Sequence, residues 1–239
     1  MKSIPRNANP RILAIDIGGS HVKCLLSGAT TRRKFASGPS LTPQQMVAGV
    51  LEMTADWTFD AVSIGYPGVV RRGAPALEPH HLAPGWVGFD FAGAFGRPVR
   101  LVNDAAMQAL GSYRGGKLLF LGLGTGLGSA LIVDGHIVAM ELGHLRRGNG
   151  HDYEDLLGEQ GFKRLGKKKW RRKVRAVVRG FGAALLPDDI VIGGGQADRL
   201  DRLPPHARRG NNAAAFLGGF RLWDESTPGT SPNTYKDLS

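Results

Sequence analysis

Two segments of the chain repeat one order of elements. Residues 11–26 and residues 118–133 each consist of an apolar, β-branched run, a glycine-rich turn and a second apolar run. Runs of this kind joined by glycines are typical of β-hairpins. Further strand and helix patterns follow both segments, which predicts an α/β fold with an internal duplication. We therefore expect two lobes around a central cleft: a smaller one over 11–104 and a larger one over 105–223, whose last helix packs back on the first lobe.

Local signals place the other elements. Thr42, Pro43 and Gln45 form the N-terminal signature of a helix that continues through residue 51. Strands are predicted at 61–65, 98–102 and 190–192, and helices at 105–110 and 211–220. Apolar residues at helical spacing predict a helix from 170 to 185, which Pro187 stops. The ends, 1–10 and 224–239, lack apolar periodicity, and we expect them to be flexible.

The cysteine content limits the chemistry. The single cysteine, Cys24, excludes an intramolecular disulfide and any zinc site built from several cysteines. His151, Asp152 and Glu154 lie close together in the sequence, but their spacing matches no zinc signature.

Composition and the N-terminus suggest the environment. The chain has 239 residues and is 42% hydrophobic, enough for a large core without covalent links. No apolar run approaches the ~20 residues that span a bilayer, and the N-terminus lacks the apolar stretch of a signal peptide. We expect a reduced, soluble, cytoplasmic protein that does not bind membranes.

Positive charge is concentrated in one segment. The formal net charge is +11, and nine of the thirteen residues from 163 to 175 are Lys or Arg. Without that segment the remainder is about +2. A solvated helix face explains such a run, and so does contact with a polyanion that relieves the mutual repulsion. The sequence leaves both interpretations open.

Three glycine clusters stand at the ends of predicted strands. They are residues 18–20, followed by Lys23, residues 122–128, and residues 193–195. Glycine lets backbone N–H groups approach an anion closely because no Cβ intervenes. A tight turn explains one such cluster equally well, and the second lacks the ending of a P-loop. Three clusters at strand ends favour phosphate binding.

Polar residues that suit acid–base chemistry follow the same strands. Asp16 ends the first strand, and Asn103-Asp104 follows a later one and opens a helix. Each has an ordinary interpretation as a turn or helix cap; alternatively Asp104 is a base at the floor of the cleft. Glu141 and His144 stand three residues apart and can bind vicinal hydroxyl groups or each other.

Taken in order, these motifs resemble those of the ROK family of sugar kinases, and most closely its polyphosphate glucokinase branch. The resemblance covers residues 11–220. The matching motifs are Asp16-x-Gly18-Gly19-Ser20 with Lys23, Asn103-Asp104, Gly124-Thr125-Gly126-x-Gly128, Glu141-x-Gly143-His144 and Gly193-Gly194-Gly195.

The resemblance implies an actin-like, ribonuclease-H-like duplicated fold and a division of roles among the residues. Asp104 corresponds to the general base on the sugar 6-hydroxyl. The residues that correspond to sugar-binding positions are Asn103, Glu141, His144, Glu154, Gly68 and His81. Those that correspond to positions around the phosphoryl donor are Asp16, Gly18, Gly19, Ser20, Lys23, Gly124, Thr125, Gly126, Gly194 and Gly195. The resemblance also implies Mg²⁺ near Asp16, no zinc site and a homodimer.

The sequence departs from the family at several points. Ser20 replaces the usual threonine but keeps its hydroxyl group. His81 stands five positions before Trp86, where the family has an asparagine that touches sugar, so the identity of the hexose stays open. The cysteines of the family's zinc site and the helix-turn-helix of its repressors are absent.

The sequence thus predicts a hexose kinase that uses polyphosphate, ATP or both to phosphorylate the 6-hydroxyl of glucose or a close hexose. One alternative is an ATP-only kinase for mannose, fructose or an N-acetylhexosamine. Another is a sugar sensor without catalysis. Nucleic-acid binding is disfavoured, because aromatic residues make up only 8% of the chain and Trp170 is the only one in the basic run.

Overall fold

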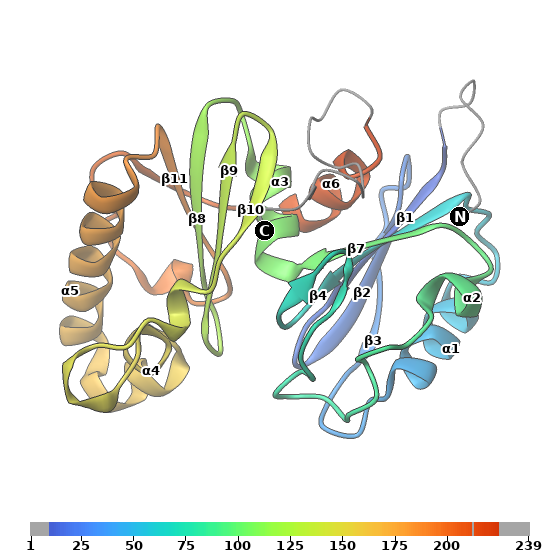
Figure 1. Ribbon diagram of the computed structural model, residues 1–239, viewed down its shortest axis with the longest axis horizontal. Helices are drawn as coiled ribbons and strands as arrows, with labels where there is room; N and C mark the ends of the chain where they lie inside the picture. Colours follow the sequence, from blue (N-terminus) through green and yellow to red (C-terminus); the bar gives the residue numbers. More distant parts are fainter. Residues whose placement is uncertain (1–9, 212, 225–239) are drawn as a thin grey trace, which may run out of the picture.

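The computed structural model describes residues 10–211 and 213–224 and contains two five-stranded sheets built to the same plan (Figure 1). The first has the order β3-β2-β1-β4-β7 and the second β10-β9-β8-β11-β12. In each, a three-stranded antiparallel meander continues into parallel strands. The predicted α/β fold with an internal duplication is thereby confirmed, and it matches the actin-like plan that the resemblance implies.

The strand bounds follow the predicted runs closely. The first sheet consists of β1 (Ile12–Ile17), β2 (His21–Leu26), β3 (Arg33–Ala36), β4 (Ala61–Tyr66) and β7 (Val99–Asn103). The second consists of β8 (Lys117–Leu123), β9 (Leu127–Val133), β10 (His136–Ala139), β11 (Asp189–Gly193) and β12 (Ala207–Arg209). A two-stranded ribbon, β5 (Val70–Arg71) and β6 (Ala74–Pro75), follows β4.

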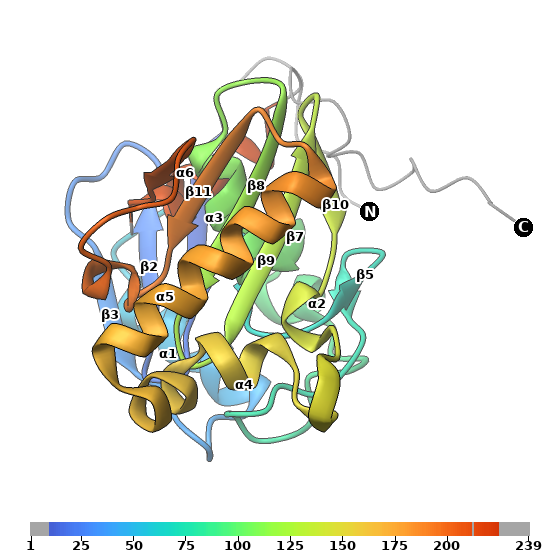
Figure 2. The same ribbon diagram turned by 90° about the vertical axis from the view of Figure 1, so that its left-hand side faces the viewer.

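Helices form the remaining layers. The helices α1 (Pro43–Met53) and α2 (Phe91–Phe95) lie outside the first sheet, whereas α4 (Tyr153–Leu157) and α5 (Glu159–Leu185) lie outside the second. Figure 2 shows α5 crossing the face of the second sheet. Between the sheets lie α3 (Asp104–Ser112) and α6 (Ala214–Arg221) (Figure 1). Short 3₁₀ turns occur at η1 (Leu142–His144), η2 (Gly148–Gly150) and η3 (Ala197–Arg199).

The helix signals read from the sequence have their expected physical basis. The Thr42 hydroxyl accepts the Gln45 N–H at 3.2 Å, and the Gln45 side chain accepts the Thr42 N–H at 3.0 Å, which completes a capping box. The α5 helix buries Trp170 and Phe181 against the second sheet and ends two residues before Pro187.

Apolar side chains form three clusters. One lies between the first sheet and α1, a second between the second sheet and α5, and a third around α3. The third cluster includes Ala105, Ala109 and Leu110, so α3 is packed along its length. The α6 helix lies close to the first sheet: a Cβ on Gly219 would stand 2.8 Å from the Cβ of Ala14.

Several elements differ from the prediction. The strands β3, β10 and β12 were not expected because they lie at sheet edges and bury no residue fully, which removes the apolar alternation that signals a strand. The last helix begins at Ala214 rather than at 211, and residue 212 lies outside the described part. The ends expected to be flexible lie outside it too, except Pro10 and Asp224. Within the described ranges no helix has the length and apolarity to cross a bilayer. The lobe boundaries stay a prediction.

Candidate active site

The junction of β7 and α3 fixes Asp104. The side-chain oxygen of Asn103 accepts the N–H groups of Ala105 and Ala106 at 2.9 and 3.2 Å, so Asn103 is the N-cap of α3. Its amide nitrogen donates to the Gly68 carbonyl at 3.0 Å, which ties the cap to the segment after β4. Asp104 is therefore the first helical residue, and its Oδ1 accepts the Ala105 N–H at 2.7 Å.

Burial raises the pKa of Asp104 into the neutral range. The pKa of Asp104 rises from 3.8 to about 7, first because burial disfavours the charged form and then because Asp16 and Glu141 lie near it. The hydrogen bond from Ala105 acts in the opposite direction and is outweighed. A carboxylate with such a pKa is partly ionised near pH 7 and is strong enough to accept a proton.

Asp16 lies at the end of β1, near Asp104. Its neighbour across the hairpin is Lys23, whose Nζ lies 3.4 Å from the Asp16 Oδ2. Burial raises the pKa of Asp16, although Lys23 lowers it. Asp16 and Asp104 thus form a region of negative charge with one partly exposed cation beside it.

In the first glycine turn, one backbone amide is already hydrogen-bonded within the hairpin. The Gly18 N–H donates to the His21 carbonyl at 3.0 Å, and the Ser37 hydroxyl donates to the Gly18 carbonyl at 2.6 Å. The Gly18 N–H thus closes the hairpin and is not available to an anion in this conformation. Gly19 and Ser20 are exposed at the tip of the turn.

Two further glycine turns are joined to each other. The Gly124 N–H donates to the Gly126 carbonyl at 3.1 Å, so this amide also closes its own turn. The Gln196 side chain donates to the Gly124 carbonyl at 2.9 Å, and its backbone N–H donates to Leu123. Gly194 has φ +83°, and a Cβ there would stand 2.2 Å from the Leu123 carbonyl oxygen. Only glycine fits this close approach.

Gln196 was not among the predicted site residues. It is 7% exposed, and its Oε1 has no hydrogen-bond partner among the described residues. Its position directly after the third glycine cluster was a signal, but its contact with Gly124 could not be read from the sequence. The exposed Thr125 and Gly195 lie on the two turns that Gln196 connects.

Glu141, His144 and Glu154 form a polar cluster beside the second glycine turn. The His144 Nε2 lies 3.7 Å from the Glu154 Oε2, and a Cβ on Gly126 would stand 2.6 Å from the Glu154 carboxyl carbon. Burial raises the pKa of Glu141, with a lowering effect of His144 and a raising effect of Glu154. Three hydrogen-bonding side chains in one place suit a ligand rich in hydroxyl groups.

His81 lies in the loop between β6 and α2. Its Cβ is 3.8 Å from the position that a Cβ on Gly19 would occupy, so this loop reaches the first glycine turn. The Glu78 carboxylate accepts the N–H groups of Gly85 and Trp86 at 3.0 Å and that of Val87 at 3.2 Å. Glu78 thereby shapes the loop, and sequence reasoning missed it because the bonds span seven to nine residues of irregular chain.

The helix that carries the basic run begins beside the second glycine turn. The N–H of Glu159, the first residue of α5, donates to the Thr125 carbonyl at 3.0 Å. Some of the charges have partners: Lys163 lies 3.0 Å from Glu159, and Arg171 and Arg175 share Asp201 at 3.1 and 3.0 Å. The expected repulsion is correspondingly weaker. The side chains of 167–169 are exposed.

A groove in the second half of the chain lies apart from these residues. It has a volume of about 550 Å³ and is bounded by η1, α4 and α5, with Tyr153, Val177 and Phe181 in its wall. Neither Asp16, Asp104 nor any of the three glycine turns lines it.

The two matching sheets, together with glycine turns and carboxylates from both of them, define a protein of the actin-like, ribonuclease-H-like α/β class. The profile of the ROK family matches residues 12–156. The chain belongs to the ROK family.

Relatives resemble the chain over most of its length. A polyphosphate glucokinase from Mycobacterium tuberculosis is 29% identical over 213 residues, covering 80% of either chain. The structure of an inorganic polyphosphate/ATP-glucomannokinase from Arthrobacter sp. strain KM has a TM-score of 0.76 at 25% identity and covers 88% of this chain and 97% of that one. A ROK family glucokinase from Streptomyces griseus, solved with glucose and AMPPNP, has a TM-score of 0.72 at 19% identity, covering 89% and 98%. This last similarity concerns the fold.

Proposed function

We propose that the protein is a hexose kinase that transfers a phosphoryl group from inorganic polyphosphate, ATP or both to the 6-hydroxyl of glucose or a close hexose. The observation that supports this most is Asp104: a carboxylate at a helix N-terminus whose pKa is raised to about 7 by burial and by the nearby Asp16 and Glu141. The names of the relatives in the same family support the substrates, glucose and polyphosphate.

The residues present suit a magnesium ion. Mg²⁺ binds through one or two carboxylates and otherwise keeps water and substrate phosphate oxygens as ligands. Asp16 provides one carboxylate, and the negative region that it forms with Asp104 favours a cation. The described residues contain no group of three or more His, Cys, Asp or Glu that could hold a metal without a substrate. Asp16 would hold the ion, which neutralises charge on the phosphates when bound.

Asp104 acts on the sugar. In the proposed reaction the 6-hydroxyl oxygen attacks the terminal phosphorus while Asp104 accepts the hydroxyl proton, and the donor leaves one phosphoryl group shorter. Glu141, His144 and Glu154 hold the ring hydroxyls and set the distance to Asp104. General-base assistance of this kind contributes ~10²–10⁴ in rate, and most of the remaining acceleration comes from alignment of the two substrates.

The donor is proposed to lie along the glycine turns. Gly19, Ser20 and Lys23 border the reacting phosphoryl group from the first sheet, and Gly126, Thr125, Gly194 and Gly195 border the rest of the donor from the second. The helix α5 begins at Glu159, whose N–H binds the Thr125 carbonyl, and the exposed lysines of 167–169 follow in α5 just after a kink at Gly166. We infer that a long polyanion leaving the site reaches these lysines. This arrangement supports polyphosphate as a donor.

One assay tests the proposal. The purified protein is incubated with Mg²⁺, either ATP or long-chain polyphosphate, and in turn glucose, mannose, fructose or an N-acetylhexosamine, and the sugar phosphate formed is measured by ion-exchange chromatography. Turnover with polyphosphate is expected. Turnover with ATP alone would support a kinase but contradict polyphosphate as its donor. Turnover only with mannose, fructose or an N-acetylhexosamine would contradict glucose as the acceptor. No turnover with any pair, alongside sugar binding by calorimetry, would indicate a sensor without catalysis.

A further inference from the structure

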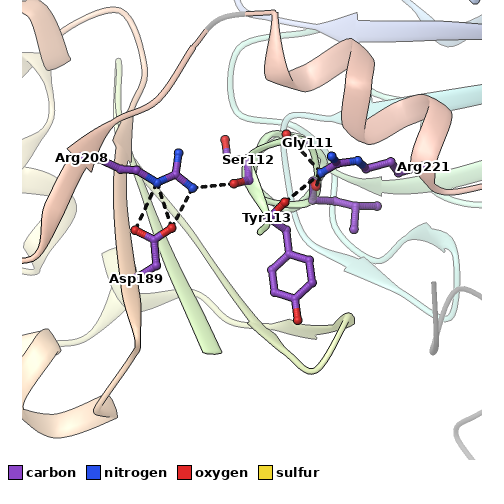
Figure 3. A network of polar contacts seen from close by, with 7 residues as sticks. Gly111, Ser112, Tyr113, Asp189, Arg208 and Arg221 are labelled. Carbon is purple, nitrogen blue, oxygen red and sulfur yellow. Dashed lines mark hydrogen bonds and ion pairs between the residues drawn. The ribbon is translucent and has the colours of Figure 1, made fainter. Parts of the chain in front are cut away.

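Two arginines hold the C-terminal end of α3, the helix that begins with Asp104 (Figure 3). The last turn of a helix leaves carbonyl groups without donors inside the helix. The Arg208 Nη2 donates to the Ser112 carbonyl at 2.5 Å. A single Arg221 nitrogen, Nη1, donates to the carbonyls of Leu110 at 2.8 Å, Gly111 at 3.3 Å and Tyr113 at 3.0 Å.

Arg208 connects α3 to the second sheet. It lies on β12, and its Nε and Nη2 also bind the Asp189 carboxylate on β11 at 2.9 and 2.7 Å. The guanidinium therefore forms a fork, with the sheet on one side and the end of α3 on the other (Figure 3). Both charged groups are only about one quarter exposed, so solvent screens this pair less than a surface pair.

Arg221 connects α3 to the first sheet through α6. Ser63, on β4, donates its hydroxyl to the Gly219 carbonyl of α6 at 2.5 Å and accepts the Trp223 ring N–H at 2.8 Å. The Arg100 side chain, on β7, donates to the Leu222 carbonyl and stacks on the ring of Trp223 at 4.4 Å. The α6 helix is thus attached to two strands of the first sheet.

The two helices also cross with no side chain between them. A Cβ on Gly111 would stand 1.8 Å from the Ala214 carbonyl oxygen, and one on Gly218 would stand 1.8 Å from the Met107 carbonyl oxygen. A displacement of α6 therefore moves α3 with it. The position of α3 relative to both sheets depends on this crossing and on the two arginines.

We propose that Arg208 and Arg221 are positioning residues for Asp104, an inference that rests on the role of Asp104 as the base in the proposed function. The α3 helix has nine residues and is about 13 Å long. A rotation of about 5° around its C-terminal end would thus move Asp104 by about 1 Å. A displacement of that size can reduce turnover about 100-fold.

The geometry of the two arginines provides the test. Arg221 reaches all three carbonyls with one nitrogen, which the ammonium group of a lysine can imitate. Arg208 needs two nitrogens in a planar fork, which lysine does not have. Arg221→Lys is therefore expected to retain most of the kcat, whereas Arg221→Met and Arg208→Lys lose about tenfold or more, with the KM for sugar and for donor changed less than twofold.

Arg33→Met is the matched control. Arg33 lies on β3, at the edge of the first sheet opposite β7, where it pairs with Asp56 and stacks on Trp57. This variant therefore also loses an ion pair and a stacked guanidinium. Its kcat is expected to equal that of the wild type. Thermal unfolding of each variant establishes that the assayed protein is folded, and the lysine pair still discriminates should the methionine variant fail to fold.

The outcomes separate the two proposals. The positioning role is overturned, with the kinase left intact, if the wild type is active and Arg208→Lys and Arg221→Lys have equal kcat values. It is overturned likewise if the two variants change KM instead of kcat. A wild type without kinase activity overturns both.

Discussion

Asp104→Asn is expected to stabilise the protein while it removes turnover. The carboxyl group is held at a pKa of about 7 against an ordinary value of 3.8. At a pH above 7 this difference corresponds to about 4 kcal/mol that the folded state loses by burying the charge. Asparagine has nearly the same shape, can still accept the Ala105 N–H, and is never ionised.

The sign of the effect depends on pH. Between pH 3.8 and about 7 the folded chain binds more protons at Asp104 than the unfolded chain, so stability falls as the pH rises. Below pH 3.8 both states are protonated and the difference disappears. The variant should therefore exceed the wild type by up to about 4 kcal/mol at pH 8 and match it near pH 4. For a chain of this size, about 4 kcal/mol is ~8–16 °C in Tm.

Thermal unfolding of the protein without sugar, donor or Mg²⁺, followed by circular dichroism at pH 4 and pH 8, measures this gain. Asp56→Asn is the control, because the pKa of Asp56 is lowered to about 2 by Arg33, and its removal should not raise Tm at pH 8. In the kinase assay, the Asp104 variant should lose ~10²–10⁴ in kcat. An unchanged Tm at pH 8 would refute the argument from burial, and wild-type turnover would refute the role as base.

Three other variants test the donor side. Gly194→Ala should destabilise the fold by about 2 kcal/mol or more, because of its positive φ and the Leu123 carbonyl 2.2 Å from the new Cβ; chemical denaturation measures this, with Gly195→Ala as the control. Gln196→Met should raise the KM for the donor and leave that for sugar unchanged, since it releases one glycine turn from the other; equal changes in both would contradict this. Replacing the lysines of 167–169 with glutamine should raise the KM for long polyphosphate but not for ATP, and flatten its dependence on salt; equal effects on both donors would mean that these side chains are only a solvated face.

The fold was predictable where its signals are local. The two hairpins around glycines, the capping box at Thr42 and the apolar stripe from Trp170 to Phe181 each lie within a few turns or strands of sequence. Edge strands were not predictable, because β3 and β10 owe their conformation to a neighbour rather than to an apolar face of their own.

In the candidate site, too, the residues marked by local sequence were predictable and those defined by long-range contacts were not. The junction at Asp104 and the glycine turns follow from residue types at strand ends. Gln196 and Arg208 were not found because their partners, Gly124 and Ser112, lie 72 and 96 residues away. No composition or spacing rule connects such positions; the contact exists only after both sheets have formed.

Opposing effects at the N-terminal end of α3 set the pKa of Asp104, and the two arginines act at the other end of the helix. The positive end of the α3 dipole and the Ala105 N–H favour the ionised carboxylate, whereas burial and Asp16 oppose it. Arginines at the other end bind the carbonyls where the dipole is negative, which stabilises the helix without reaching the carboxylate. Because both guanidinium groups lie at the far end of α3, they fix the helix and leave the raised pKa of Asp104 to burial and to its acidic neighbours.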